Sequence, residues 1–327
     1  MTTIPATAYK KVRNCLVAFC CAAVLLPWVG AGPLHIRETL DFHSIDSYIF
    51  FQLRVTRTLL GLFAGGAFSL AGTLFQAVLR DALATPYTLG ISTGASLGAV
   101  VAISLGWTVV FGIPATWLGA MVGSALVLFI VMGFAARQRR ISAFGLLLTG
   151  VAVNSICASL IVLLHSLAGV TRSFSISRWL IGSVDATSYG SMCVFVLTVI
   201  AISLLVISRA KDWNLVAVDE EWAASRGVRV RSVLLNGYVS GSVLTAGAIA
   251  LTGPIGFVGL IVPHMVRGRI SSDHRVLMPC SFFLGGILLA SCDAVGRVVL
   301  APAEVPAGVI LALLGGPYLI WLVRGRL

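Results

Sequence analysis

The feature that most constrains the fold of this chain is the length of its uncharged apolar runs. No Asp, Glu, Lys or Arg lies between Asp81 and Arg137, and a second uncharged run extends from Ser232 to Val266. Only 11% of the 327 residues are charged, whereas about a quarter is usual for a soluble domain. In a bilayer every backbone polar group has to be hydrogen bonded within the protein, which helices achieve locally. The sequence therefore predicts an all-α, polytopic transmembrane bundle that forms a single domain over residues 1–327.

Charges and turn-forming residues divide the chain into about ten predicted spans, since a bilayer crossing needs roughly 20 apolar residues. The run after Asp81 is long enough for two spans, separated by a Gly- and Pro-containing turn at 106–114. The run over 232–266 divides at a turn over 252–254, because a single crossing would place the arginines that follow it outside. The predicted spans are residues 14–34, 58–79, two within 82–136, 144–167, 192–207, 232–251, a short or broken span ending near 266, 276–294 and 306–323.

The distribution of basic residues predicts the orientation of these spans. The ten-span topology puts most of the 23 Lys and Arg on the inner side, together with both termini, as the positive-inside rule requires. The net charge of +11 is then a consequence of membrane orientation. Nucleic-acid binding is not expected.

The sequence lacks the residues that would make the chain an enzyme or a self-powered carrier. The Gly-x-x-x-x-Gly-Lys-Ser/Thr loop that cradles ATP phosphates does not occur, so any ATP hydrolysis has to come from another subunit. The His and Cys residues are dispersed without the spacing of a metal site, and no metal or cofactor is expected in this chain. Ion-driven carriers usually bury ionisable groups in their spans, yet Asp293 is the only acid predicted inside one. An ion-driven secondary carrier and a membrane scaffold without transport therefore remain the less favoured alternatives.

The longest predicted inner loop, residues 209–231, contains a short helix of its own. Asp219, Glu220 and Glu221 are placed to open it, because acidic side chains are favoured at the positive end of the helix dipole. Gly227 is placed to end it in the left-handed conformation. A short helix held between two spans is a rigid element that a cytoplasmic ATPase could contact and push. The alternative is a solvated connector, which would have a similar sequence.

Several ordered motifs resemble the FecCD and BtuC family of permeases, the membrane subunits of type II ABC importers for iron-siderophores, haem and cobalamin. The most specific one reads Gly-Pro-Ile-Gly-Phe-Val-Gly-Leu-Ile-Val-Pro-His-Met-Val-Arg over 253–267. The other motifs that resemble the family lie at Arg54 to Gln76, Asp81 to Gly98, Arg178 to Ser183 (Arg-Trp-Leu-Ile-Gly-Ser), Asp219 to Val228, and the C-terminal stretch with Asp293, Arg297, Glu304 to Pro306 and Gly315 to Pro317. They are spread from Arg54 to the end of the chain.

The resemblance implies roles for particular residues. Arg54 and Arg297 would face outward and receive acidic residues of a periplasmic binding protein. Gln76 and Asn154, polar residues within spans, would either line the path or hydrogen bond within the bundle. The residues implied in ATPase coupling are Asp219, Glu220, Glu221, Ala223, Arg226 and Gly227, and those implied in cytoplasmic gating are Asp81, Thr85, Arg139, Arg140 and Ser142.

The resemblance also implies an assembly: two permease chains, identical or paralogous, two ATPase subunits that bind ATP and Mg, and a binding protein, in a bacterial cytoplasmic membrane. Iron-siderophore is the expected cargo, with haem and cobalamin as alternatives. This sequence departs from the family pattern at Thr56 in place of Pro, Asp81 and Ala82 in place of Asn-Pro, Thr85 in place of an acid, and Arg226 in place of Leu. The change at Asp81 adds a charge near the expected gate, and Arg226 is expected to alter the ATPase contact.

Overall fold

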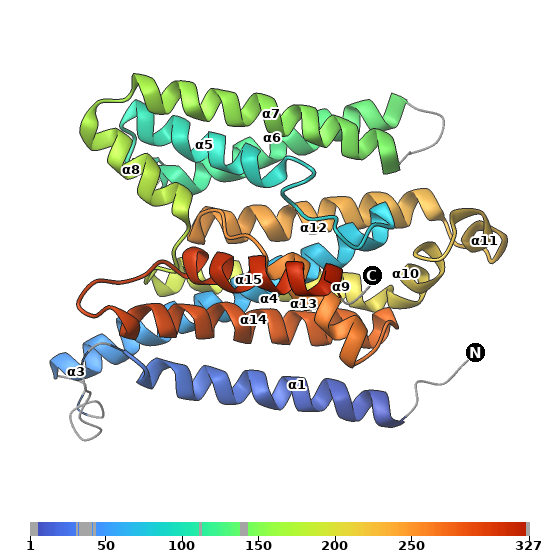
Figure 1. The fold of residues 1–327 in the computed structure, drawn as a ribbon, viewed down its shortest axis with the longest axis horizontal. Coiled ribbons are helices and arrows are strands. Elements are labelled where there is room, and N and C mark those ends of the chain that lie inside the picture. Colours follow the sequence, from blue (N-terminus) through green and yellow to red (C-terminus); the bar gives the residue numbers. More distant parts are fainter. Residues whose placement is uncertain are drawn as a thin grey trace.

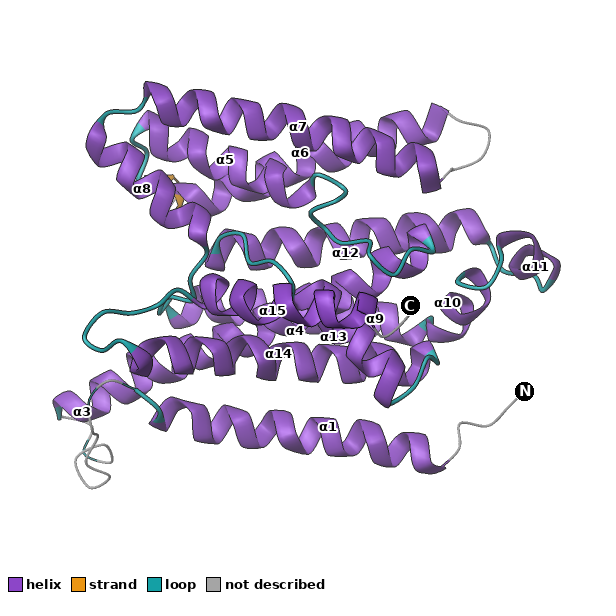
Figure 2. Cartoon of the chain, viewed as in Figure 1, coloured by secondary structure: helices purple, strands orange, loops and turns teal. Residues whose placement is uncertain are grey.

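A computed structural model describes residues 6–30, 32, 41, 44–110, 113–137 and 143–324 of the chain. The fold is a bundle of helices joined by short loops, with one small hairpin (Figures 1 and 2). The elements are α1 (Ala6–Leu25), η1 (Leu26–Trp28), α3 (Ile45–Tyr48), η2 (Ile49–Val55), α4 (Thr56–Leu79), α5 (Ile91–Leu105), β1 (Val109–Val110), β2 (Ile113–Pro114), α6 (Ala115–Arg137), α7 (Ala143–Leu167), α8 (Val170–Ile181), α9 (Tyr189–Ser208), α10 (Ala210–Val216), α11 (Glu220–Ser225), α12 (Val230–Thr252), α13 (Val258–Arg269), α14 (His274–Val299) and α15 (Ala307–Arg324).

Helix α4 forms the centre of the bundle. Almost all of its side chains are buried, and it packs against α12, α13 and α14 (Figure 1). Its sequence alternates Leu and Phe with Gly, Ala, Ser and Thr. Small residues let neighbouring helices approach closely, which compensates for the absence of a hydrophobic driving force between helices in lipid.

Helices α5, α6 and α7 form a separate layer on one side of the bundle, and α1 covers the opposite side against α14 (Figure 1). The closest approach in the layer is between α5 and α6, where Gly98 and Gly119 face each other's backbone. A Cβ atom at either position would overlap the carbonyl group of the other. This pair therefore depends on glycine for its packing.

Each of the ten predicted spans corresponds to a helix. Among the described residues, seven helices are long and apolar enough to cross a membrane, and two shorter apolar helices cover Ile91–Leu105 and Ala307–Leu322. The short span predicted to end near 266 corresponds to α13. The predicted breaks are confirmed as well. Gly106 has a φ of 74° at the end of α5, and Gly253 ends α12 with a φ of 67° before Pro254.

Two boundaries were wrong. The first helix was predicted over 14–34, but it begins at Ala6 and gives way at Leu25 to the short η1 helix, which contains Pro27. The stretch before Thr58 was predicted to lie outside the helices, yet α3, the π-helix η2 and α4 run without interruption from Ile45. The physical reason is that Arg54 and Arg57 find partners within the fold. Helices α8 and α10 were not predicted at all.

Candidate functional site

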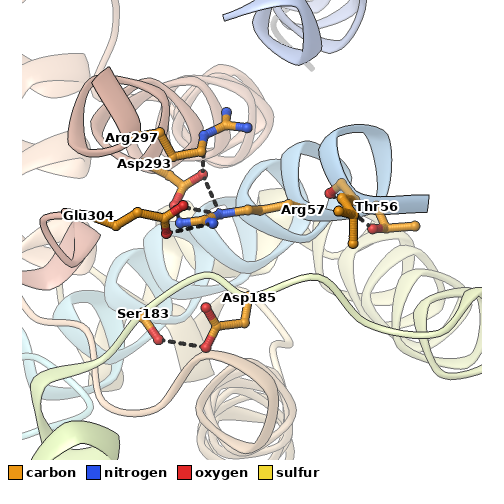
Figure 3. Close-up of polar contacts among 8 residues, drawn as sticks. Thr56, Arg57, Ser183, Asp185, Asp293, Arg297 and Glu304 are labelled. Atoms are coloured by element: carbon orange, nitrogen blue, oxygen red, sulfur yellow. Dashed lines mark hydrogen bonds and ion pairs between the residues drawn. The ribbon is translucent and has the colours of Figure 1, made fainter. Parts of the chain in front are cut away.

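A cluster of four charged side chains lies at one end of the bundle. We call it the Arg57 cluster: Arg57 in the first turn of α4, Asp293 and Arg297 one turn apart on α14, and Glu304 in the loop before α15. Figure 3 shows the Arg57 guanidinium between the two carboxylates. Its Nε and Nη2 atoms donate to Asp293 at 2.9–3.1 Å, and its Nη1 atom lies 2.9 Å from Glu304 Oε2. The bidentate geometry is the strong form of an Arg–carboxylate pair.

The Arg57 cluster is buried unequally. The side chain of Asp293 is only 2% exposed and that of Arg297 6%, whereas Glu304 is 51% exposed. Arg297 Nε lies 3.4 Å from Asp293 Oδ2, so the one buried carboxylate faces two guanidinium groups. Because a charge taken out of water is stable only when it is paired, Asp293 holds the cluster together.

Arg54, predicted to face the outer side, lies at the same end of the bundle, and its side chain is buried. Its Nη2 atom donates to the Gly32 carbonyl at 2.7 Å, and its Nη1 atom lies 3.4 Å from the Trp28 carbonyl. The guanidinium packs closely on Gly30, so a Cβ atom at that position would require the Arg54 side chain to move. Arg54 is therefore hydrogen bonded within its own chain, whereas Arg297 has the ion pair with Asp293, and its buried Nη2 atom has no hydrogen-bond partner among the described residues.

At the opposite end of the bundle, α11 projects from the rest of the molecule (Figure 1). Asp219 is its N-cap, accepting a 2.8 Å hydrogen bond from the Trp222 backbone N–H, and this satisfies one of the free donors at the helix start. Gly227 follows the helix with a φ of 84°, a conformation that favours glycine. The short helix and both of its ends are as predicted.

The side chains of α11 differ in what they can contact. Ala223 is fully buried against its own chain, so it can seat the helix but cannot reach a partner. Glu220 pairs with Arg80 at 2.7 Å, which ties α11 to the end of α4. Arg226 lies 4.9 Å from the centre of the exposed Trp222 ring, a cation–π contact. Trp222 and Arg226 thus belong to the exposed surface of α11, together with Glu221, Ala224 and Ser225.

The residues predicted for the gate fall into two groups. Asp81 and Thr85 lie in the loop after α4, where Asp81 Oδ1 accepts from the Leu83 N–H at 2.9 Å and Thr85 exchanges hydrogen bonds with Thr88. The loop begins at Arg80, which has a φ of 51°. The other three predicted gate residues, Arg139, Arg140 and Ser142, lie outside the described residues.

Both polar residues predicted within spans are hydrogen bonded inside the bundle. Gln76 is 3% exposed, donates to the Gly259 carbonyl at 3.3 Å and accepts from Arg267. Asn154 accepts from Thr93, which joins α7 to α5. Of the two roles weighed for these residues, in-bundle hydrogen bonding is the one that this geometry shows.

The sequence did not identify Arg57 and Glu304 as site residues. Arg57 lies within the Arg54 to Gln76 motif and Glu304 within the C-terminal motif, and neither received a role of its own. The available signal was the isolated acid Asp293, since a lone buried carboxylate requires a cationic partner. Thr56, in place of the usual Pro, donates from its hydroxyl to the Gln52 carbonyl at 2.7 Å and so caps a carbonyl at the end of η2.

Two small, partly open cavities share Tyr87, Gly256 and Phe257. One, of about 350 Å³, also touches Ser92 and Ser96, and the other, of about 330 Å³, extends toward the loop with Thr85. Phe257 has a φ of 69°, a left-handed conformation for a non-glycine residue, which is costly unless the surroundings enforce it.

In the described ranges, His, Cys, Asp and Glu nowhere gather in a group of three or more that could hold a metal ion.

A bundle of helices long and apolar enough to cross a membrane, with charged clusters near its two ends, is the architecture of a polytopic membrane protein. The model of the FecCD transport family matches residues 15–325. The chain belongs to this family and is an ABC importer permease.

Relatives and solved structures of this class cover most of the chain. It is 33% identical to the hemin transport system permease protein HmuU of Yersinia pestis over 90% of its own length and 89% of the relative's. It is 34% identical to the cobalamin import system permease protein BtuC of Halobacterium salinarum, over 92% and 80%. A metal-chelate type ABC transporter in an inward-facing conformation superposes with a TM-score of 0.83 at 26% identity, covering 97% of this chain and 99% of that one.

Proposed function

We propose that this chain is the permease subunit of an ATP-driven importer that moves an iron-siderophore across a bacterial cytoplasmic membrane. The placement of α11 and the Arg57 cluster at opposite ends of one bundle carries the proposal (Figure 1). One end offers a rigid helix to a motor, and the other offers charges to a delivering protein. Both termini would lie on the α11 side, in the cytoplasm.

The proposed assembly has two permease chains, two ATPase subunits that bind ATP and Mg, and a periplasmic binding protein. Haem and cobalamin are the alternative cargoes, since relatives of this chain are named for them. Charged contacts at the rim of an interface mainly set orientation and association rate. Docking through Arg54 would require an incoming carboxylate to displace the Gly32 and Trp28 carbonyls, and docking through Arg297 would require its buried guanidinium to become accessible.

Uptake into liposomes tests the proposal. The permease, reconstituted with its ATPase and binding protein, should accumulate one of ferric siderophore, haem or cobalamin only when ATP is inside. A proton or sodium gradient should not replace ATP. Accumulation driven by such a gradient without ATP would instead establish the secondary carrier.

We expect Arg226→Glu to weaken association with the ATPase about tenfold, because charge reversal at a docking surface replaces attraction by repulsion. Because Arg226 stacks on Trp222, we expect the docking cleft of the ATPase to have an apolar wall that contacts the Trp222 ring and a carboxylate that pairs with Arg226. Binding of detergent-solubilised permease to the immobilised ATPase at two salt concentrations measures the effect. Arg178→Glu, on exposed α8 away from α11, is the matched control. Equal affinity of both variants would contradict the assigned surface.

A further inference from the structure

One side chain ties the segment that leads into α11 to the start of α14. Asn214, in α10, donates from Nδ2 to Asp273 Oδ1 at 2.7 Å. Its Oδ1 atom accepts from the His274 backbone N–H at 2.8 Å and lies 2.8 Å from His274 Nδ1. We call these three residues the Asn214 clasp. The Asn214 side-chain amide thus uses both its nitrogen and its oxygen, and its partners are the N-cap and the first residue of α14.

Asp273 is fixed on its other side as well. It is the N-cap of α14, accepting from the Arg275 N–H at 2.9 Å, and its carboxylate pairs with Arg275 Nη2 at 2.6 Å. Burial alone would raise the pKa of Asp273, but hydrogen bonds from Arg275 and Asn214 outweigh it and lower the pKa to about 2. Because the pKa is depressed on folding, this stabilisation is present above about pH 4 and is lost only as the pH falls toward 2. The clasp is therefore intact at physiological pH.

The segment around Asn214 is otherwise held by packing and by one ion pair. Trp213 is 1% exposed and lies so close to Gly237 of α12 that a side chain there would overlap its ring. At the far end of the segment, Glu220 pairs with Arg80. Helices α10 and α11 thus form a unit with a packed contact to α12, an exposed ion pair to α4, and the Asn214 clasp to α14.

Helix α14 connects the two ends of the molecule. Its 26 residues span about 39 Å at 1.5 Å per residue. The first of them, His274, is part of the clasp, and the last turns carry Asp293 and Arg297 of the Arg57 cluster. If the first turn of α14 is displaced, this one helix can transmit the movement to the Arg57 cluster at the far end of the bundle.

We infer that Asn214 is the positioning residue that makes α14 follow α11 when α11 is displaced. The inference rests on the proposed function, because the ATPase supplies the displacement. Hydrogen bonds at both ends of the amide fix distance and direction, and the ionised Asp273 strengthens one of them. A purely apolar contact would let α10 slide along α14, whereas these hydrogen bonds hold the two helices in one position.

Asn214→Asp tests the clasp, because it places a second carboxylate against that of Asp273 while keeping an acceptor for His274. We expect the α10 amides to exchange hydrogen roughly tenfold faster, and uptake per ATP hydrolysed to fall several-fold, since contacting residues are energetically coupled. Adding Asp273→Asn to Asn214→Asp exchanges the amide and the acid, and restores one donor between them. The double variant should recover both readouts to within about twofold of wild type.

Asn236→Asp is the matched control, because Asn236 is half-buried and its hydrogen bond lies within α12, to Ser232 Oγ at 3.4 Å. It should leave both readouts unchanged. Faster α10 exchange with normal uptake per ATP would overturn the coupling role, and unchanged exchange would overturn the clasp itself. Absence of ATP-dependent uptake in the wild type would count against the proposed function, and the exchange measurement would still decide whether the clasp exists.

Discussion

Asp293→Ala is expected to lower the free energy of unfolding by about 3–5 kcal/mol, because removing one partner of a buried pair leaves the other charge uncompensated. Here the nearly inaccessible Arg297 loses its ion-pair partner, and Arg57 loses its bidentate partner and keeps only the half-exposed Glu304. Thermal unfolding of the purified protein in detergent, followed by circular dichroism, measures the loss. A lower yield of monodisperse protein should accompany it.

Glu304→Ala is the control for this prediction, since Glu304 pairs with the same guanidinium. Glu304 is 51% exposed, and a pair open to solvent contributes about 0–1 kcal/mol. The two carboxylates thus differ in burial while sharing Arg57. Similar losses for both variants would show that the cluster is solvated and that Asp293 does not hold it together.

Gly119→Ala is expected to cost about 1–3 kcal/mol, which is typical when atoms are forced into a packed interface. The new Cβ would overlap the carbonyl of Gly98, so α5 and α6 would have to separate along their contact. Because the obstacle is backbone, no side-chain rotation can relieve it. Thermal unfolding in detergent is again the measurement.

Gly133→Ala, in the same helix α6, provides the comparison, because no other atom lies within 4 Å of a Cβ placed there. It should be neutral or stabilise the helix by up to about 1 kcal/mol, since Ala loses less backbone entropy than Gly on folding. A loss at Gly133 equal to that at Gly119 would point to a general intolerance of α6 and not to contact with α5.

The local features of the chain were predictable because their causes are local. The break between α12 and α13 follows from Gly253 and Pro254, which interrupt an apolar run. The ends of α11 follow from Asp219 and Gly227, whose side chain and backbone freedom act within a few residues. The family motifs also predicted the class of protein, and the match of the FecCD family model over residues 15–325 confirms that prediction.

The contacts of the charged groups were not predictable in this way. The sequence indicated that Arg54 and Arg297 lie at one end, but not that both are buried with partners of their own. Asn214 received no role, since its partners Asp273 and His274 lie about 60 residues away. A hydrophobicity pattern contains no information on which side chains meet across such separations.

The sequence by itself therefore determined the spans, their breaks, the short helix of the 209–231 loop and the family. The spans could be read from the sequence because a bilayer requires apolar helices of a set length and excludes charge from their centres. Only the tertiary structure decided that Asp293 joins Arg57 to Arg297, and that Asn214 joins α10 to α14. A buried polar group is stable only with a partner in the right place, and that place is set by how the helices pack.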